Sequence, residues 1–202
     1  MERPLIGDSQ GRYRIHIVGN SGTGKSTVAK KLSQILDIPY VSLDSLFWRP
    51  NWEETPHAEF KALVSKTMND NPNGWIIDGN YQNHVGKLVQ DTATDIIWLD
   101  PPFLLYFPRV LVRTFLRLIG LETPCSPGCK ESFREVLFSR NSILCWCWCD
   151  HRVHRERGGN RMKEIGLGVG SDVENQRMRR LGGWGKELSE WIKRVESMVR
   201  GR

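Results

Sequence analysis

The stretch Gly19 to Ser26, with the sequence GNSGTGKS, decides the fold. A predicted strand from Tyr13 to Val18, with Ile15, Ile17 and Val18 as its apolar residues, precedes it, and apolar residues at helical spacing follow it as far as Leu36. The order is therefore strand, glycine-rich loop and helix, as a phosphate-binding loop requires. The glycines let the backbone curl around an anion, and successive N–H groups at the helix N-terminus supply partial positive charge. This context favours a nucleoside triphosphate site over a coincidental glycine-rich turn.

Each part of this loop has an expected role. Lys25 is expected to reach the β- and γ-phosphates, and the hydroxyl of Ser26 is expected to bind a magnesium ion. We therefore expect ATP and Mg²⁺ as cofactors. The residues expected to surround the nucleotide are Gly19, Asn20, Ser21, Gly22, Thr23, Gly24, Lys25, Ser26 and Thr27.

The length and composition indicate one α/β domain spanning residues 1–202, because single domains commonly contain about 100 to 200 residues. Hydrophobic residues make up 39% of the chain and charged residues 26%, which is typical of a globular protein. The N-terminal sequence MERPLIGDSQGR lacks an apolar stretch of signal-peptide length, and no run approaches the roughly 18 apolar residues of a membrane span. We expect a cytoplasmic protein without a membrane partner.

The net charge of +6 is concentrated in the second half of the chain. Residues 1–99 contain 10 Lys and Arg against 11 Asp and Glu, whereas residues 100–202 contain 19 against 12. Such a basic half can face the phosphates of a small ligand or the backbone of a nucleic acid. A solvated basic surface is the commoner outcome.

All five cysteines lie between Cys125 and Cys149. Their odd number argues against a disulfide framework, and no pair has the C-x-x-C spacing of a zinc ribbon. We expect thiols on a helix rather than a metal site.

Four further segments predict strands, and helical patterns separate them. Two of them, Trp75–Ile77 and Ile96–Leu99, are short and wholly apolar, which indicates a parallel sheet covered by helices on both faces. The last of the four contains two arginines. The expected strands are Tyr40–Leu43, Trp75–Ile77, Ile96–Leu99 and Met178–Leu181.

The long connection between the last two strands is expected to be mainly helical. Pro102 to Gly120 and Glu131 to Arg157 have helical patterns, and a loop containing glycine and proline joins them. The glycine-rich segment from Gly158 to Asn175 is expected to be irregular, with room for a helical turn near Met162. After the last strand, apolar residues from Trp184 to Val199 form one stripe of a final helix.

Three aspartates, Asp44, Asp78 and Asp100, each end an apolar run, and the carboxyl ends of parallel strands line one crevice. Asp78 is the expected magnesium ligand, usually through water, because Gly79 lets the backbone pass close to the site. Asp100 is the alternative, although a helix N-cap before Pro101 explains it equally well. Asp44 is expected to take a proton from an acceptor hydroxyl, or else it simply closes the second strand.

Arg109 and Arg113 lie one helical turn apart, next to the loop of glycine and proline. If residues 119–160 form a lid, both guanidinium groups are placed to bind the β- and γ-phosphates when it closes. A solvated helix face is the alternative interpretation. With Lys25 and Asp44, these arginines are the candidate catalytic residues.

Several segments together resemble one family. They are GNSGTGKST, VSLDSLFWRPNWEETP, WIIDGNY, IIWLD and PRVLVRTFLR. The set resembles the P-loop kinase-like proteins related to adenylate kinase, a group often labelled "DNA topology modulation protein". The resemblance implies a three-layer αβα fold of the P-loop NTPase type, with a five-stranded parallel sheet in the order 2-3-1-4-5 and a helical lid. It also implies that Asp78 serves magnesium and that Arg109 and Arg113 contact phosphates.

The chain departs from this family at the acceptor side. Adenylate kinases continue after Asp-Gly with an aromatic residue, a proline and an arginine, whereas Asn80-Tyr81-Gln82 stands here. Arg49 also lies further past Asp44 than the acceptor-binding arginine of adenylate kinases would. These departures argue against a nucleoside monophosphate as the acceptor.

The sequence thus predicts a kinase that transfers the γ-phosphoryl group of ATP, with Mg²⁺, to a small acceptor. The alternative is a nucleotide-dependent regulatory or nucleic-acid-binding protein that has only ATPase activity. The sequence contains no helix-turn-helix, zinc-finger or RNA-binding signature, so a nucleic-acid partner is the less favoured of the two.

Overall fold

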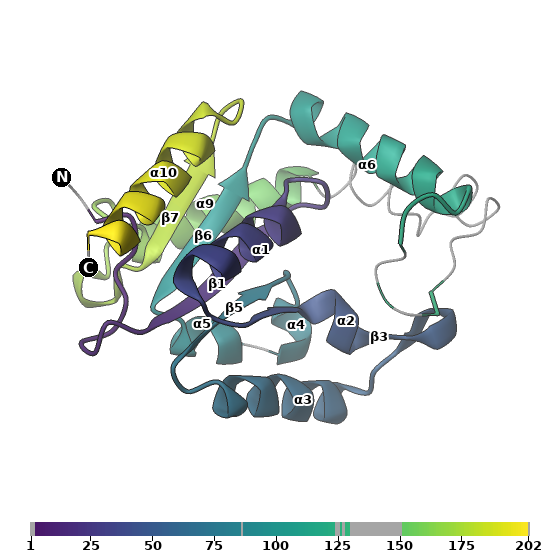
Figure 1. Ribbon diagram of the computed structural model, residues 1–202, viewed down its shortest axis with the longest axis horizontal. Helices are drawn as coiled ribbons and strands as arrows, with labels where there is room; N and C mark the ends of the chain where they lie inside the picture. Colours follow the sequence, from purple (N-terminus) through teal and green to yellow (C-terminus); the bar gives the residue numbers. More distant parts are fainter. Residues whose placement is uncertain (1–2, 86, 124–125, 127, 130–150, 202) are drawn as a thin grey trace.

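The computed structural model describes residues 3–85, 87–123, 126, 128–129 and 151–201. Its centre is a five-stranded sheet in the order β2-β5-β1-β6-β7, and all neighbouring strands are parallel (Figure 1). Counted along the chain, this order is the expected 2-3-1-4-5, because the hairpin of β3 and β4 lies outside the sheet. The strands are β1 (Tyr13–Gly19), β2 (Tyr40–Ser42), β5 (Gly74–Asp78), β6 (Asp95–Asp100) and β7 (Met178–Gly182).

Two helices cover one face of the sheet, α1 (Lys25–Leu36) and α10 (Lys186–Arg200) (Figure 1). Strand residues that point to this face, such as Ile15 and Ile17, are completely buried against the apolar sides of both helices. Trp191 of α10 is buried there too, and its indole N–H donates a hydrogen bond to the Pro4 carbonyl oxygen. This contact ties the N-terminal segment to the last helix.

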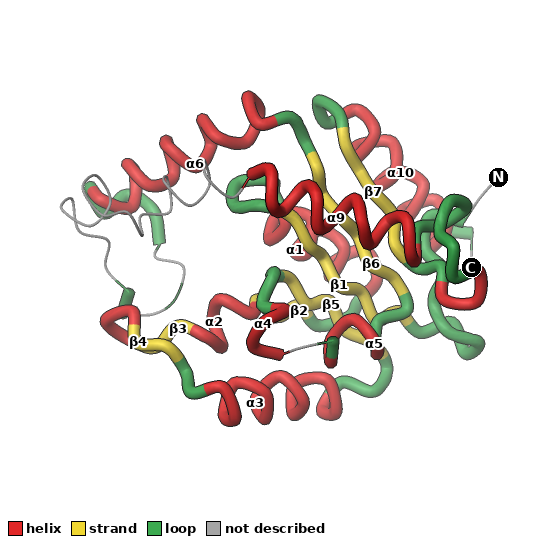
Figure 2. The backbone as a smooth tube through the Cα atoms, turned by 180° about the vertical axis from the view of Figure 1, so that it is seen from behind, coloured by secondary structure: helices red, strands yellow, loops and turns green. Residues whose placement is uncertain are grey.

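The opposite face carries α3 (His57–Asp70), α5 (Leu88–Thr92) and α9 (His151–Ile165) (Figure 2). Phe60 and Val64 of α3 are fully buried against Trp75 and Ile77 of β5. The centre of the sheet is therefore buried on both faces, which explains why β5 and β6 are apolar runs rather than alternating patterns. The three-layer α/β fold expected from the sequence is confirmed.

Short elements and one long helix complete the described chain. The helix α6 (Phe103–Leu118) follows β6 and contains Pro108 in its second turn. The short elements are α2 (Leu43–Phe47), β3 (Trp48–Arg49), η1 (Pro50–Trp52), β4 (Glu53–Glu54), α4 (Gln82–Val85) and η2 (Val173–Asn175). In the part of the chain that the structure describes, no helix is both long and apolar enough to cross a membrane.

Some sequence-based expectations are wrong. The first part of the segment from Gly158 to Asn175 is helical, because α9 continues through it to Ile165, whereas turns, bends and η2 form most of the rest. The helix expected from Glu131 lies outside the described residues as far as position 150, as do four of the five cysteines; Cys129 is described and buried. Trp184 does not belong to the buried stripe of the last helix, since it precedes α10 and is 68% exposed.

A buried histidine on β1 predicts an acid-sensitive fold. The Nε2–H of His16 donates to the Gly79 carbonyl oxygen, and Nδ1 has no hydrogen-bond partner among the described residues. Burial, with a smaller effect of the Arg161 charge, lowers its pKa from 6.5 to about 4. The unfolded chain therefore takes up this proton first as the pH falls. We expect a loss of about 2–3 kcal/mol of unfolding free energy between pH 7 and pH 4.5 from this group.

Denaturant unfolding at several pH values would measure this effect. His16→Gln keeps a donor for Gly79 and removes the titrating group, so its unfolding free energy should fall less steeply below pH 6.5. His57 is exposed, and His57→Gln is the matched control that should keep the steep dependence. Identical slopes for both variants would contradict the prediction.

Candidate functional site

The glycine-rich loop connects β1 to α1 at the carboxyl edge of the sheet. Its shape is held by the carbonyl oxygen of Asn20, which accepts hydrogen bonds from the Thr23 hydroxyl at 2.8 Å and from Lys25 Nζ at 3.0 Å. The Lys25 ammonium group therefore lies over the loop that is expected to surround the phosphates. Because α1 begins at Lys25, its first N–H groups face the same space.

Gly22 shows why this loop needs glycine. Its φ is +78°, and a Cβ atom there would lie 2.5 Å from Cγ2 of Val110 and 2.8 Å from the carbonyl oxygen of Tyr106. Both neighbours belong to α6, so the loop is packed directly against that helix. Any side chain at Gly22 would push the loop and α6 apart.

Ser26 and Asp78 meet across the sheet edge. The Ser26 hydroxyl donates to Oδ2 of Asp78 at 2.8 Å, and Asp78 is 3% exposed. Burial raises the pKa of Asp78, while the Lys25 charge and the hydroxyls of Ser26 and Ser42 act in the opposite direction. A serine hydroxyl beside a carboxylate offers the hard oxygen ligands that Mg²⁺ prefers, so this pair fits the expected metal.

Asp100, the alternative metal ligand, is engaged in ion pairs. Its Oδ2 accepts hydrogen bonds from Nε and Nη2 of Arg180 at 2.9 and 2.6 Å, and Nε of Arg155 lies at 3.3 Å. Arg180 also stacks on Trp98, 5.2 Å from the ring centroid. These contacts join β6, β7 and α9, which gives Asp100 a structural role.

Asp44 lies in the short helix α2 and not at the end of β2. Its carboxylate is exposed and accepts a hydrogen bond from the Tyr81 hydroxyl at 2.7 Å. The charge of Asp44 also raises the pKa of Asp78, so the two carboxylates lie close enough to interact. Tyr81 follows Asp78 by three positions, and this link connects α2 to the end of β5.

The two arginines of α6 differ in position. Nη2 of Arg113 donates to Oγ of Ser21 at 2.7 Å, so this guanidinium group touches the glycine-rich loop. Arg109, one turn earlier, is exposed to solvent. Of the expected pair, only Arg113 is thus held at the loop in this structure.

Sequence reasoning missed three polar residues around the loop. Asn80 donates to the carbonyl oxygen of Gly19 at 2.7 Å and accepts from its N–H at 3.1 Å, which fixes the end of β1 to the end of β5. The Tyr106 hydroxyl accepts from Nδ2 of Asn20 at 3.0 Å and lies 2.6 Å from Nδ1 of His151. The position of Asn80 directly after Asp78-Gly79 could have identified it from the sequence. No sequence feature pointed to Tyr106 or His151.

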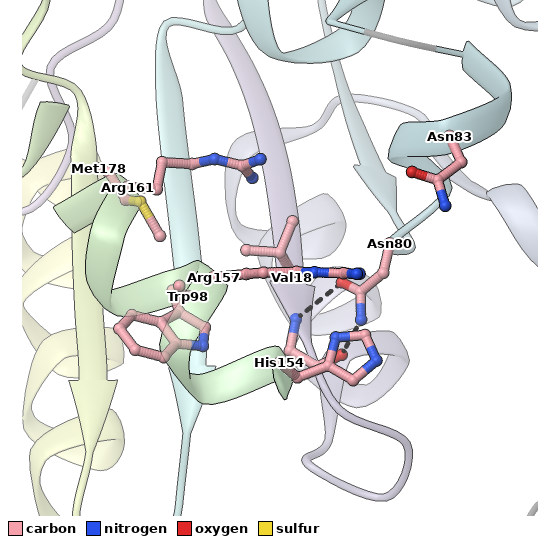
Figure 3. Close-up of a pocket in the computed structure, with 10 residues that line it drawn as sticks. Val18, Asn80, Asn83, Trp98, His154, Arg157, Arg161 and Met178 are labelled. Atoms are coloured by element: carbon pink, nitrogen blue, oxygen red, sulfur yellow. Dashed lines mark hydrogen bonds between the residues drawn. The ribbon is translucent and has the colours of Figure 1, made fainter. Parts of the chain in front are cut away.

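A cavity opens beside this loop, between α9 and the sheet (Figure 3). It contains about 510 Å³ of space without protein atoms, part of it open to solvent. The residues that line it are Val18, Gly19, Asn80, Asn83, Trp98, His154, Arg157, Gly158, Arg161 and Met178. Gly19 belongs both to the lining of the cavity and to the glycine-rich loop, so the cavity borders the loop.

No protein-family model and no curated protein sequence matches this chain. Among solved structures, a protein described as a candidate kinase from Chloroflexus aurantiacus j-10-fl has a TM-score of 0.51 and 14% identity, over 94% of this chain and 97% of that chain. A gluconokinase from Sinorhizobium meliloti 1021 has a TM-score of 0.48 and 15% identity, over 94% of each chain. A shikimate kinase from Acinetobacter baumannii in complex with shikimate has a TM-score of 0.47 and 12% identity, over 95% of each chain.

At such identities the likeness concerns the fold alone. The chain has the three-layer α/β fold of P-loop kinases, with the glycine-rich loop at the carboxyl edge of its sheet. The three descriptions name kinases, and none of them names DNA.

Proposed function

We propose that the protein is an ATP-dependent phosphotransferase that uses Mg²⁺ and transfers the γ-phosphoryl group to a small acceptor. The observation that carries the proposal is the convergence of Lys25, Ser26, Asp78 and Arg113 on one loop of a P-loop kinase fold. Phosphoryl transfer needs positioning and charge neutralisation more than covalent participation of the protein. These four side chains supply both.

The roles follow from the contacts. Backbone N–H groups between Gly19 and Thr27 bind the phosphates, and Lys25 neutralises charge on them. Ser26 and Asp78 would hold Mg²⁺, which would neutralise negative charge on the phosphates. Arg113 rests on Ser21 and is placed to contact the transferred group.

Asp44 is the proposed general base. A carboxylate oriented by the Tyr81 hydroxyl can accept the proton of an acceptor hydroxyl during transfer. We treat residues 1–202 as one domain in which the region of residues 119–160 is the lid. Arg109, which is exposed, is proposed to join Arg113 at the phosphates when this lid closes over the glycine-rich loop. Most of that region lies outside the described residues.

A panel of hydroxyl-bearing and phosphorylated metabolites with labelled ATP would test the function. It should contain nucleosides, nucleotides, sugars, sugar acids and coenzyme precursors. At least one acceptor is expected to become labelled in a Mg²⁺-dependent manner. If none consumes ATP above the hydrolysis background, the kinase assignment is wrong.

The second candidate is a nucleotide-dependent protein that binds nucleic acid. The exposed arginines of α9, among them Arg152, Arg155 and Arg157, favour it. Binding to DNA or RNA should then weaken steeply with salt, and each removed phosphate contact should lower the log–log slope by about one unit. Absence of salt-dependent binding would exclude this candidate.

A further inference from the structure

The side of α9 that faces the sheet is polar where a three-layer fold usually buries apolar residues. His154, Arg157, Gly158 and Arg161 follow one another at helical spacing and line the cavity described above. Only beyond them does α9 contribute apolar contacts to the core, through Met162 and Ile165. His154 and Arg161 are half-buried at this position, whereas Arg157 is exposed.

Gly158 explains how α9 approaches the sheet closely enough to form this polar wall. A Cβ atom at this position would lie 2.5 Å from Cε2 and Cζ2 of Trp98, so only glycine lets the helix rest on that ring. Arg157 and Arg161 flank this contact on the same helix. In Figure 3 both side chains extend from α9 toward Asn80 and Asn83 on the far side of the cavity.

The cavity is positively charged. Arg157 and Arg161 supply two guanidinium groups one helical turn apart, and none of the ten described residues that line the cavity is a carboxylate. Like charges at this spacing repel each other, so an anion between them would be stabilising. Among the described residues, the charge of Glu164 raises the pKa of Arg161, and burial lowers it by more. His16, the neighbouring titratable group, stays neutral above about pH 4 and adds no charge.

The other walls suit a small polar molecule. Val18, Trp98 and Met178 form an apolar side. Asn80 is fixed by its two hydrogen bonds to Gly19, so its position relative to the glycine-rich loop is rigid.

We propose that this cavity is the acceptor site and that it selects an acceptor carrying a carboxylate or phosphate group, which Arg157 and Arg161 bind. The proposal rests on the proposed phosphotransferase function. Guanidinium groups match carboxylate and phosphate oxygens with paired hydrogen bonds, and such charge-assisted bonds are the strong ones. Since the cavity shares Gly19 with the phosphate-binding loop, an acceptor held here lies next to the expected γ-phosphate.

Matched ligands would test this specificity. The first set is glucose, which is neutral, gluconate, which carries a carboxylate, and glucose 6-phosphate, which carries a phosphate. Adenosine and adenosine monophosphate form a second pair of a neutral and a charged ligand. Their binding would be measured by thermal shift and calorimetry with the glycine-rich loop saturated by Mg²⁺ and a non-hydrolysable ATP analogue, so that anions cannot bind there. At least one charged member is expected to bind, and its neutral counterpart is expected to bind at least about tenfold more weakly.

Variants of α9 localise the effect. Arg157→Gln and Arg161→Gln are each expected to weaken binding of the anion about tenfold or more, whereas Arg152→Gln, on an exposed position of the same helix, should not. Because Arg157 is exposed, its replacement should fold even if Arg161→Gln does not. Equal binding of neutral and charged members, unchanged binding in both variants, or no binding by any charged member would overturn the proposal.

The outcome is separable from that of the proposed function. Lys25→Ala is expected to lose ATP turnover and to keep anion binding in this cavity. Anion binding without phosphoryl transfer to any acceptor would contradict the proposed kinase function and leave the proposed anion site intact. Efficient transfer to a neutral acceptor, at a rate that Arg157→Gln and Arg161→Gln do not change, would overturn the proposed anion site and leave the proposed kinase function intact.

Discussion

Lys25→Ala is expected to lower the rate of ATP turnover by about 100- to 1,000-fold, as does the removal of one preorganised charge stabiliser in other enzymes. Lys25 is the first residue of α1, and its ammonium group bonds to the Asn20 carbonyl oxygen above the loop. Its charge is therefore held where negative charge gathers during transfer. Steady-state turnover of labelled ATP with Mg²⁺ would measure the loss.

The control for this experiment lies on the same helix. Lys30 is exposed on α1, and Lys30→Ala removes the same charge without touching the loop. It should keep full turnover. Both variants should retain the far-ultraviolet circular dichroism of the wild type, because neither position is in the core. Unchanged turnover in Lys25→Ala would refute the assignment of the loop.

The parts of the fold that the sequence predicts are those with local signals. The loop from Gly19 to Ser26, the apolar runs and the final amphipathic helix are all visible in short windows of the sequence. Burial on both faces makes β5 and β6 apolar runs. The strand order came from the resemblance, and the sheet confirms it. The pairing of Ser26 with Asp78 was the long-range expectation that could be reasoned from topology, since both lie at the carboxyl edge.

The rest depends on contacts that no short window contains. Gly158 and Gly159 suggested an irregular segment, yet α9 runs through them because Gly158 packs on Trp98, far away in sequence. The sequence shows the helical spacing of His154, Arg157 and Arg161, but it does not show that this side of the helix faces the sheet. Tertiary contact therefore decided both the helix and the polar wall.

Two carboxylates at the sheet edge also have roles that depend on tertiary contacts. Asp78 and Asp100 end β5 and β6, the two strands that flank β1, and the sequence alone presents them as alternatives. Their environments separate them. Asp78 meets a serine hydroxyl of the loop, whereas Asp100 meets two arginines. Replacing each by the isosteric amide should accordingly give opposite results.

Asp78→Asn is expected to weaken the Mg²⁺ dependence of nucleotide binding and turnover by about 10- to 100-fold, because its carboxylate is lost while the Ser26 hydroxyl keeps an acceptor. The melting temperature without ligands should change little, since the carboxylate that is removed is buried and its pKa is raised by burial. The stabilisation that Mg²⁺ adds to an ATP analogue should largely disappear. This binding readout does not depend on catalysis.

Asp100→Asn should do the reverse. It breaks the pairs with Arg180 and Arg155, whose side chains are 45% and 55% exposed, so a loss of about 1 kcal/mol of unfolding free energy is expected. The Mg²⁺ dependence should stay at the wild-type value. If Asp100→Asn instead abolishes the Mg²⁺ effect while Asp78→Asn retains it, the metal site belongs to the end of β6 and Asp78 serves only to fix the loop through Ser26.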